Sequence, residues 1–571
     1  MKPSVCALVG ALLATAAPAA AQTTAKAALS TVTAPAAAAP APRLVVVISV
    51  DQLSGDLYDK WRGRFTGGLK RLSEGLVYPS GYQTHAATET CPGHATLLTG
   101  KRPNKTGIVA NNYRDPATGK QVYCLFDPTK ALAHGGTQPP VGPQRLLATT
   151  LGDWLKQASP ASRVVAVSAK DRGAIAMAGH NPDGVFWIQP GFGFTTYVTP
   201  GADVARALAP VRALNAETAE VWRRRPTWTS EHAECRALAS DWVLGGKPWR
   251  SQLPPTGFGA SADEAAIRND VMGSPIPDAL TLQAAQRLIR HYDLGRGRGV
   301  DLLAVSFSAT DYIGHRYGSQ GPEMCDQMHR LDALIGRLLA DLDARKVPYL
   351  VVLTADHGGS DFTERLNAQG YPGARRIDDK AGLERVNRAL MAELGLDVPP
   401  LTGTMEDVFV TARTPEAHGR IAAAAARLLT AQPEVAAAFT QEDLLATPIL
   451  KGKPADEVSV RERLAMSTYP GRSPDLSAAL QPYSTRAAAI PGGYVAGHGS
   501  VWNYDRRVPI LFWWKGAPRQ TRFLPVETVD IGPSLAAVLR LTPPADIDGR
   551  CLPLADRAPG ACVAEAIAAA E

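Results

Sequence analysis

Thr90, in the stretch 88–96 (TETCPGHAT), stands in a sequence context that suits a nucleophile. A threonine hydroxyl attacks poorly near neutral pH unless a metal ion or the N–H groups of a helix N-terminus stabilise the loss of its proton. Pro92 and Gly93 separate Thr90 from an apolar run, 95–98, that is predicted to open a helix and to bring exposed amides close by. The alternative interpretation is a plain helix cap. The rest of the chain decides between the two.

Aspartates and histidines elsewhere in the chain have the types and spacing of metal ligands. Asp311 and His315 are four positions apart, so both can face one ion from a helical turn. Asp356 and His357 are adjacent at the end of an apolar run, and His498 lies between two glycines, whose backbone freedom suits a ligand on a loop. Each alone is more often a surface or core residue, but together they form the mixed nitrogen and oxygen set that zinc accepts. The predicted set is Asp51, Asp311, His315, Asp356, His357 and His498.

Three further residues are suited to holding a phosphate group. Two metal ions about 3.5–4 Å apart can hold the attacking and the leaving oxygen of an in-line phosphoryl transfer. Asn111 offers an amide donor to a phosphoryl oxygen, and Lys170 and Arg172 offer positive charge to a dianionic monoester. The alternatives are a turn former for Asn111 and a solvated loop for the two cations.

Four apolar runs rich in β-branched residues are each followed by one of these charged groups. Such runs are typical of parallel strands that are covered on both faces. In an open α/β sheet, ligands bind at the carboxyl ends of the strands. A single charged residue after a strand usually marks only the point where the chain leaves the core. Four such residues, whose types together suit binding of metal and phosphate, favour a shared site. The runs are 44–50 before Asp51, 163–169 before Lys170, 302–307 before Asp311 and 349–355 before Asp356.

These patterns predict an α/β fold with a mostly parallel central sheet and helices on both faces. An apolar stripe over 328–342 predicts one packing helix, 279–289 predicts another, and 507–513 predicts a further strand. Two stretches break the alternation and are predicted to be insertions over the active-site edge, at about 181–278 and 362–491. We expect one catalytic domain over 44–562 and a C-terminal tail over 563–571.

The first 21 residues have the pattern of a secretory signal peptide, with Lys2, a mostly apolar run over 5–17 and small residues before Gln22. An uncleaved membrane anchor is the alternative, although the run is short for a span. Residues 22–43 are rich in Ala, Pro and Thr and are predicted to be a linker. We therefore expect a periplasmic or secreted protein without a membrane span.

The cysteines agree with an oxidising compartment. The chain has seven cysteines, and those that remain after removal of Cys6 form an even set. None lies at C-x-x-C spacing, which argues against a thiolate zinc site. Proximity in the sequence favours the pairs Cys91–Cys124, Cys551–Cys562 and, from the remainder, Cys235–Cys325.

The net charge of +6 is mild for 571 residues, and basic residues form only short clusters, so nucleic acid is not a predicted partner. The expected partners are small phosphate esters, and the expected state is a monomer. The histidines outside the ligand set are interpreted as structural or surface residues: His85, His94, His134, His180, His232, His291, His329 and His418.

Taken together, the motifs resemble those of the alkaline phosphatase superfamily, most closely its threonine-nucleophile branch, the bacterial PafA/PhoK-type alkaline phosphatases. The sulfatase branch has Cys-x-Pro-x-Arg, whereas Pro92 here follows Cys91 directly. The resemblance covers 44–562, nearly the whole mature chain. Its motifs are 49–52 (SVDQ), 90–94 (TCPGH), 107–111 (GIVAN), 170–172 (KDR), 311–315 (DYIGH), 354–359 (TADHGG) and 498–499 (HG).

The resemblance implies two zinc ions and a phosphorylated Thr90 that is hydrolysed with net retention at phosphorus. It assigns one zinc to Asp311, His315 and His498, and the other to Asp51, Asp356, His357 and the Thr90 oxygen. It also implies that Asn111, Lys170 and Arg172 hold the non-bridging oxygens, which favours an alkaline phosphatase acting on monoesters. The first alternative is a phosphodiesterase or nucleotide pyrophosphatase of the same superfamily, and the second is a phosphate- or metal-binding protein without turnover. Calcium binding in the insertions stays open.

Overall fold

A large mixed sheet runs through the part of the chain that the computed structural model describes, which is residues 41–115, 118–134, 138–486, 488, 493–554 and 562. The predicted signal peptide, nearly all of the predicted linker and the predicted tail lie outside these residues. The strand order is β21 (Gln520–Thr521), β2 (Leu76–Tyr82), β20 (Arg507–Trp514), β13 (Tyr349–Thr354), β1 (Leu44–Val50), β12 (Asp301–Phe307), β6 (Val164–Ser168), β7 (Gly184–Gln189) and β8 (Gly193–Thr195), with β22 (Val526–Glu527) beside β2.

The four strands predicted to carry charged groups are neighbours at the centre of this sheet. β13, β1, β12 and β6 pair in parallel, and their residues are fully buried, as their β-branched sequences require. Ser49 is in register with Thr354 on one side and with Ser306 on the other, and Ser306 is in register with Ser168. The four strands therefore end at one level of the sheet.

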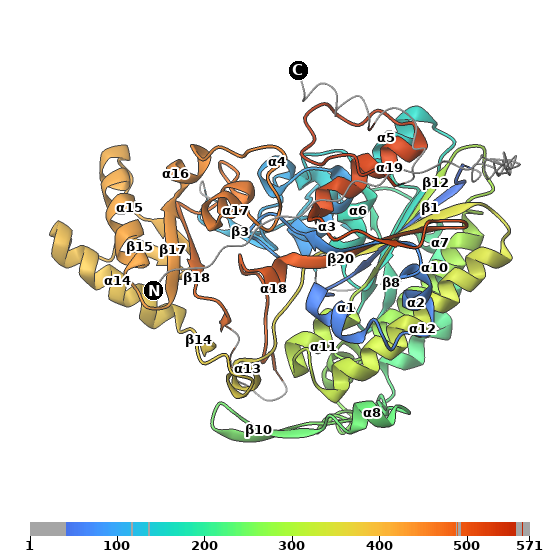
Figure 1. Cartoon of the computed structure of the whole chain (residues 1–571), viewed down its shortest axis with the longest axis horizontal. Coiled ribbons are helices and arrows are strands. Elements are labelled where there is room, and N and C mark those ends of the chain that lie inside the picture. The colour runs from blue at the N-terminus through green and yellow to red at the C-terminus, as the bar shows by residue number, and fades with distance from the viewer. Residues whose placement is uncertain are drawn as a thin grey trace, which may run out of the picture. The chain divides into compact units, whose positions relative to one another are not determined.

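Helices cover both faces of the sheet (Figure 1), and alternate residues of β1 belong to two different hydrophobic cores. Val46 and Ile48 contribute to one hydrophobic core and Val45 and Val47 to the other. The predicted mostly parallel α/β fold is confirmed. The first core is covered by α1 (Gly55–Trp61), α2 (Gly68–Leu72), α10 (Ile276–His291) and α12 (Pro322–Ala344), and the second by α3 (Thr90–Thr99), α5 (Leu151–Ala158), α6 (Asp171–Ala178) and α19 (Ile531–Leu539).

Helix α3 begins earlier than the sequence predicts. Pro92 and Gly93 lie inside its first turn rather than before it, so Thr90 is the first helical residue. Proline is tolerated there because the first turn has no use for its missing N–H group. A Cβ on Gly93 would collide with the backbone oxygen of Asp356, so the glycine serves close packing against the end of β13.

The stretch predicted as the second insertion, 362–491, contains a separate antiparallel sheet with its own hydrophobic cluster (Figure 1). Its strands are β15 (Leu401–Gly403), β16 (Asp407–Val410), β18 (Leu476–Leu480) and β17 (Val435–Thr440), packed with α14 (Asp379–Leu394) and α15 (Pro415–Thr430). The helices α13 (Thr363–Ala368), α16 (Gln441–Leu445) and α17 (Val460–Ser467) and the paired strands β14 (Arg375–Arg376) and β19 (Ser484–Thr485) complete this stretch.

The stretch predicted as the first insertion, 181–278, begins by contributing β7 and β8 to the main sheet. It leaves the sheet only after these strands, whose apolar residues stand among many prolines and glycines. It continues with β9 (Tyr197–Val198), α7 (Val204–Glu217), α8 (Ala233–Arg236), the hairpin β10 (Ser240–Leu244) and β11 (Lys247–Ser251), and α9 (Glu264–Met272).

All three expected disulfides, Cys91–Cys124, Cys235–Cys325 and Cys551–Cys562, are present. No helix among the described residues is long and apolar enough to cross a membrane. The remaining described α-helices and β-strands are α4 (Pro103–Thr106), β3 (Asn112–Arg114), β4 (Gln121–Tyr123), β5 (Ala131–Leu132), α11 (Ala309–Tyr317) and α18 (Asn503–Arg506).

Candidate metal centre and active site

The structure brings the six predicted ligands together at the carboxyl end of the sheet, in two groups of three. Asp311, His315 and His498 form one group, and within each group the ligand atoms lie within 4.8 Å of one another. The other group is Asp51, Asp356 and His357. Asp51 directly follows β1, and Asp356 and His357 follow β13. Asp311 and His315 are on α11, the helix after β12, and His498 is on the loop before α18.

In the first group, two imidazoles point toward one carboxylate oxygen. Asp311 Oδ1 lies 3.3 Å from His315 Nε2 and 3.2 Å from His498 Nε2. The other nitrogens donate to backbone carbonyls, His315 Nδ1 to Ala496 at 2.9 Å and His498 Nδ1 to Thr88 at 2.8 Å. A carbonyl only accepts, so Nδ1 carries the hydrogen and a neutral ring presents its Nε2 lone pair. This is how protein imidazoles are oriented toward a metal.

The second group is completely buried and repeats the pattern. His357 Nε2 lies 3.4 Å from both Asp51 Oδ1 and Asp356 Oδ2, and its Nδ1 donates to the Gly358 carbonyl at 2.8 Å. Asp51 Oδ1 and His357 Nε2 have no hydrogen-bond partner, and Asp356 Oδ2 has only the His94 ring nearby, at 3.1 Å from its Nδ1. Burying polar atoms without hydrogen-bond partners lowers the stability of the fold, and here the lone pair of His357 Nε2 faces two carboxylate oxygens, which are also acceptors. A divalent cation that takes mixed nitrogen and oxygen ligands would satisfy all of them.

The pKa shifts reflect the same crowding of charge. Burial, together with the carboxylates of Asp311 and Asp356, raises the pKa of Asp51 well above its ordinary value. Burial lowers the pKa of His357 to about 3. Burial acts in the same direction on His498, but the Asp311 carboxylate outweighs it and raises the pKa of that ring to about 9.

Lys170 lies between the two groups. Its Nζ is 2.6 Å from Asp51 Oδ2 and 2.5 Å from Asp311 Oδ2, and its side chain is almost inaccessible to solvent. Burial alone would lower the pKa of Lys170, but these carboxylates outweigh it and raise the pKa above its ordinary value. The ring of Tyr312 lies 4.9 Å below the ammonium group. Lys170 is therefore a fixed positive charge beneath the site rather than a side chain on a solvated loop.

Thr90, Asn111 and Arg172 line one cavity of about 360 Å³, together with Asp311, His315 and His498. Asn111 accepts a hydrogen bond from the Cys91 N–H with its Oδ1 at 2.8 Å, so its amide NH₂ is the group left for a ligand. Arg172 lies in the first turn of α6, and its Nε is buried without a hydrogen-bond partner. The structure thus gathers these residues, while their catalytic roles stay predictions.

Sequence reasoning missed two neighbours of Thr90. Glu89 accepts a hydrogen bond from the Asn111 N–H at 2.6 Å and so joins that loop to the start of α3. His94 was expected to be structural or on the surface, and its position agrees with a structural role; what the sequence did not show is how near it lies to Thr90 and Asp356. It is fully buried, with Nδ1 2.9 Å from the Thr90 carbonyl oxygen and 3.1 Å from Asp356 Oδ2. Its spacing of one helical turn from Thr90 was the available signal.

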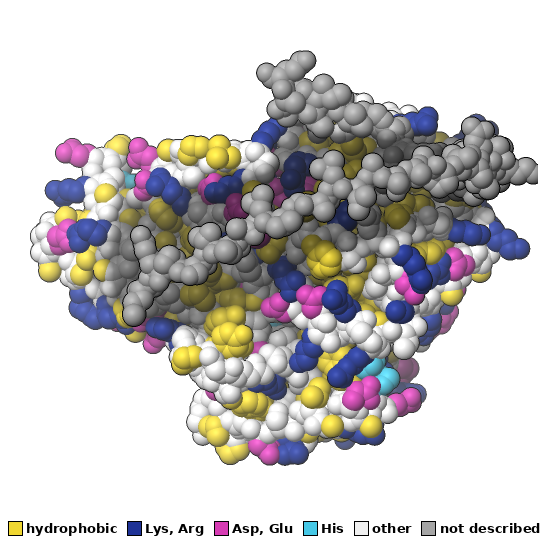
Figure 2. Space-filling view, viewed as in Figure 1, with side chains coloured by type: hydrophobic (Ala, Val, Ile, Leu, Met, Phe, Trp, Pro, Cys, Tyr) yellow, Lys and Arg dark blue, Asp and Glu magenta, His cyan; other side chains and the backbone are white. Residues whose placement is uncertain are grey.

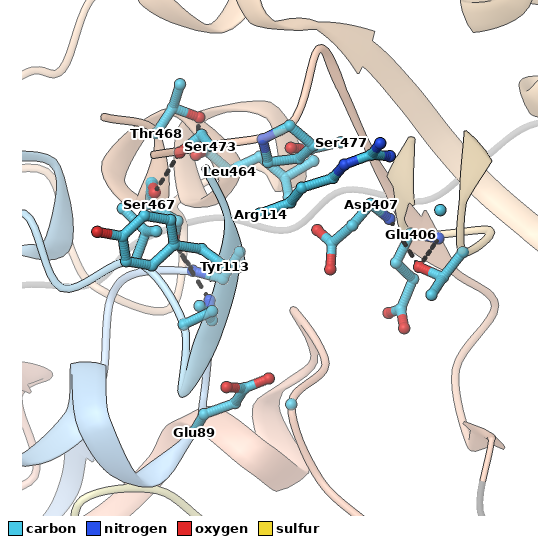
Figure 3. Close-up of a pocket in the computed structure, with 18 of the residues that line it drawn as sticks. Glu89, Tyr113, Arg114, Glu406, Asp407, Leu464, Ser467, Thr468, Ser473 and Ser477 are labelled. Carbon is cyan, nitrogen blue, oxygen red and sulfur yellow. Dashed lines mark hydrogen bonds between the residues drawn. The ribbon is translucent and has the colours of Figure 1, made fainter. Parts of the chain in front are cut away.

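A second cavity of about 170 Å³ adjoins the first and shares Glu89, Glu406 and Arg486 with it. Figure 3 shows Glu406 and Asp407 on one side of it and Tyr113 on the other. Burial raises the pKa of Glu406 to about 7. The sheet of the stretch 362–491 therefore supplies part of the wall beside the active site, and this wall carries both signs of charge.

Comparison with known proteins agrees with this geometry. Residues 45–388 match the family described as type I phosphodiesterase / nucleotide pyrophosphatase. The chain belongs to this family. It is 40% identical to alkaline phosphatase PhoK of Sphingomonas sp, over 90% of this chain and 92% of that one. It is also 40% identical to alkaline phosphatase PhoD of Zymomonas mobilis, over 90% and 88% of the two chains.

The predicted resemblance to the PafA/PhoK branch of the superfamily is thereby confirmed. Alkaline phosphatase PafA of Elizabethkingia meningoseptica is 28% identical over 90% of this chain and 94% of its own. A crystal structure of wild-type PafA superposes with a TM-score of 0.77 at 25% identity, covering 90% of this chain and 99% of that one. Both the family and the fold thus agree with the prediction.

Proposed function

We propose that this family member is an alkaline phosphatase that hydrolyses phosphate monoesters through a phosphothreonine intermediate, with two zinc ions. The observation that carries the proposal is that Thr90 lines one cavity with the ligand group Asp311, His315 and His498, while Lys170 lies between this group and the second one. The curated relatives named alkaline phosphatases, at 40% identity over most of the chain, support it.

Each ligand group would hold one ion. Asp311, His315 and His498 would bind the first, and the second would lie among Asp51, Asp356, His357 and the Thr90 oxygen. When bound, the ions supply positive charge that stabilises the attacking and the leaving oxygen of the phosphoryl transfer.

The side chains of the protein carry out the phosphoryl transfer and hold the phosphate group. Thr90 loses its hydroxyl proton to solvent, and its Oγ1 forms a bond to phosphorus as the bond to the ester oxygen breaks. The ester oxygen leaves with that electron pair and takes up a proton to become the alcohol. Water then attacks the phosphothreonine, releasing phosphate and restoring the hydroxyl, so that two in-line displacements give net retention. The Asn111 NH₂ and the Arg172 guanidinium hold the non-bridging oxygens, and Lys170 adds a fixed charge beside them.

The alternative is a phosphodiesterase or nucleotide pyrophosphatase, which the description of the matching family favours. A monoester dianion carries more charge than a diester anion, so Lys170 and Arg172 favour the monoester. The test compares kcat/KM for an aryl phosphate with that for its bis-aryl diester. A higher kcat/KM for the monoester is expected, and a clear preference for the diester would overturn the proposal.

We also propose that the protein is periplasmic or secreted and that the mature chain is a monomer. The pattern of residues 1–21 and the three disulfides support export to an oxidising compartment. Mass spectrometry of the exported protein should find Gln22 at its N-terminus. A chain that retains Met1 and stays with the membrane would favour the anchor instead.

A further inference from the structure

A further cluster of ligand-type side chains lies where α8 packs on α12, and it shares no residue with the active-site groups. His232 directly precedes α8, Glu234 is on α8, and His329 is on α12. His329 Nε2 lies 3.2 Å from Glu234 Oε1, and His232 Nδ1 lies 3.7 Å from the same oxygen. The two imidazole rings stack with their centroids 3.9 Å apart and their planes 12° from parallel, so one ring must turn about its side-chain bonds before both rings can direct a nitrogen at the same ion.

The spacing of these atoms suits a small divalent ion. Ligands bound tetrahedrally at about 2.0–2.2 Å lie roughly 3.3–3.6 Å from one another. The observed separations of 3.2 and 3.7 Å are close to this range. Two imidazoles and one carboxylate suit zinc and related transition metals, whereas magnesium and calcium prefer sites made only of oxygen.

One ring nitrogen of the cluster lacks a hydrogen-bond partner. His329 Nε2 is buried and has no hydrogen-bond partner, although it faces the Glu234 carboxylate. A buried ring nitrogen without a partner loses its interaction with water and gains nothing in return. A metal ion between His329 and Glu234 would supply that partner.

The segment that carries His232 and Glu234 is attached to α12 on both sides. The disulfide Cys235–Cys325 joins α8 to α12, and Cys325 lies one helical turn before His329. Before the cluster, Trp228 Nε1 donates to Asp326 Oδ2 at 2.7 Å.

Arg330 Nη2 also donates to the Thr229 carbonyl, at 2.7 Å, so α12 fixes this segment at several points. The rings of Trp61 and His329 form a T-shaped pair with their centroids 5.9 Å apart. Ligands that are held in place before binding lose little conformational entropy when the ion arrives.

We propose that His232, Glu234 and His329 form a third metal site, which takes a zinc-class divalent ion and leaves one coordination position open to solvent. Histidine and acidic side chains lie together at the surface near the position of α8 (Figure 2). The ion cross-links the stretch 181–278 to α12, beside the disulfide that joins the same two elements.

The experiment measures zinc in the full-length mature protein after equilibration with zinc chloride and dialysis. Wild type should hold one more equivalent per chain than His329→Gln. The matched control is His418→Gln, because His418 Nε2 also lies beside a carboxylate, 3.3 Å from Asp475 Oδ1, but belongs to no three-residue ligand group among the described residues. Its zinc content should equal that of wild type.

Anomalous diffraction at the zinc edge locates the ion independently of the active site. Wild-type crystals should show a peak among the three side chains, and crystals of His329→Gln should lack it. Glu234→Gln provides a second variant, because its side chain is 46% exposed and its loss leaves the core unchanged. Both variants should keep their hydrolysis of an aryl phosphate. Equal zinc in all proteins, or no peak at this cluster in wild type, would overturn the proposal, whatever the fate of the proposed phosphatase activity.

Discussion

The ammonium group of Lys170 is the charge on which the preference for monoesters most depends. It lies 2.6 Å from an oxygen of Asp51 and 2.5 Å from an oxygen of Asp311, so it is held between the two ligand groups. A monoester dianion carries one more negative charge than a diester anion. Replacing Lys170 by alanine should therefore slow hydrolysis of the monoester more than that of the diester.

The size of the difference follows from Coulomb's law. One unit charge acting on another about 4 Å away contributes about 4 kcal/mol at an effective dielectric constant of about 20. Since a tenfold change in rate corresponds to about 1.4 kcal/mol, this is an upper limit of roughly three powers of ten. Removing one preorganised group that stabilises developing charge costs about 10²–10³ in kcat. We expect Lys170→Ala to reduce kcat/KM by about 10²–10³ for an aryl phosphate and by about tenfold or less for the bis-aryl diester.

The assay determines kcat/KM for both substrates at one pH, with the metal content of each protein measured alongside. Lys156→Ala is the matched control, because Lys156 Nζ also pairs with a carboxylate, Asp183 Oδ2 at 2.7 Å, but lies outside the active-site cavity. It should leave both rates unchanged. Equal losses on the two substrates in Lys170→Ala, with the metal retained, would refute the charge argument.

Three further outcomes are expected. Thr90→Ala should keep its fold and metals but form no covalent phosphate, as measured by intact mass after an acid quench, and wild-type rates in this variant would remove Thr90 from the mechanism. Chelation should abolish hydrolysis and added zinc should restore it, whereas full activity in protein shown to be metal-depleted would contradict the metal requirement. Burial raises the pKa of Glu323 to about 7, above an unfolded value near 4.5. Between these two pH values the folded state binds more protons than the unfolded state, so the free energy of unfolding falls as pH rises. Glu323→Gln should lose less stability than wild type between pH 4.5 and 7.5 in urea unfolding, by about 2–4 kcal/mol, and parallel pH profiles would show that Glu323 does not titrate in this way.

The central strands could be predicted because each is buried on both faces. A strand covered on both sides has no polar face, so its sequence is one unbroken apolar run, as 44–50 and 349–355 illustrate. The strands β7 and β8 were not predicted, because they are short and stand among many prolines and glycines. Local sequence signals are weakest in such surroundings.

The start of α3 could not be predicted for a different reason. Pro92 and Gly93 ordinarily mark the approach to a helix, and the sequence alone favours that interpretation. The backbone of Asp356, which is distant in the sequence, packs so closely against α3 that only glycine fits at position 93. This contact explains why Gly93 lies inside the helix. Tertiary packing therefore overrides the local signal.

The position of Lys170 also depends on contacts far apart in the sequence. That it follows β6 was visible in the sequence, but its approach to Asp51 and Asp311 requires β6, β12 and β1 to be consecutive neighbours, which one sequence does not reveal. Because parallel strands end at the same edge whatever their order, a common site was predictable from the strand ends alone. The strand order decides which of these side chains contact one another. Because β1 lies between β13 and β12, Asp51 lies in one ligand group with Asp356. The Oδ2 atom of Asp51 contacts Lys170, which also contacts Asp311. The coupling of the two ligand groups through one buried charge is thus a property of sheet topology, and the Lys170 variant tests it directly.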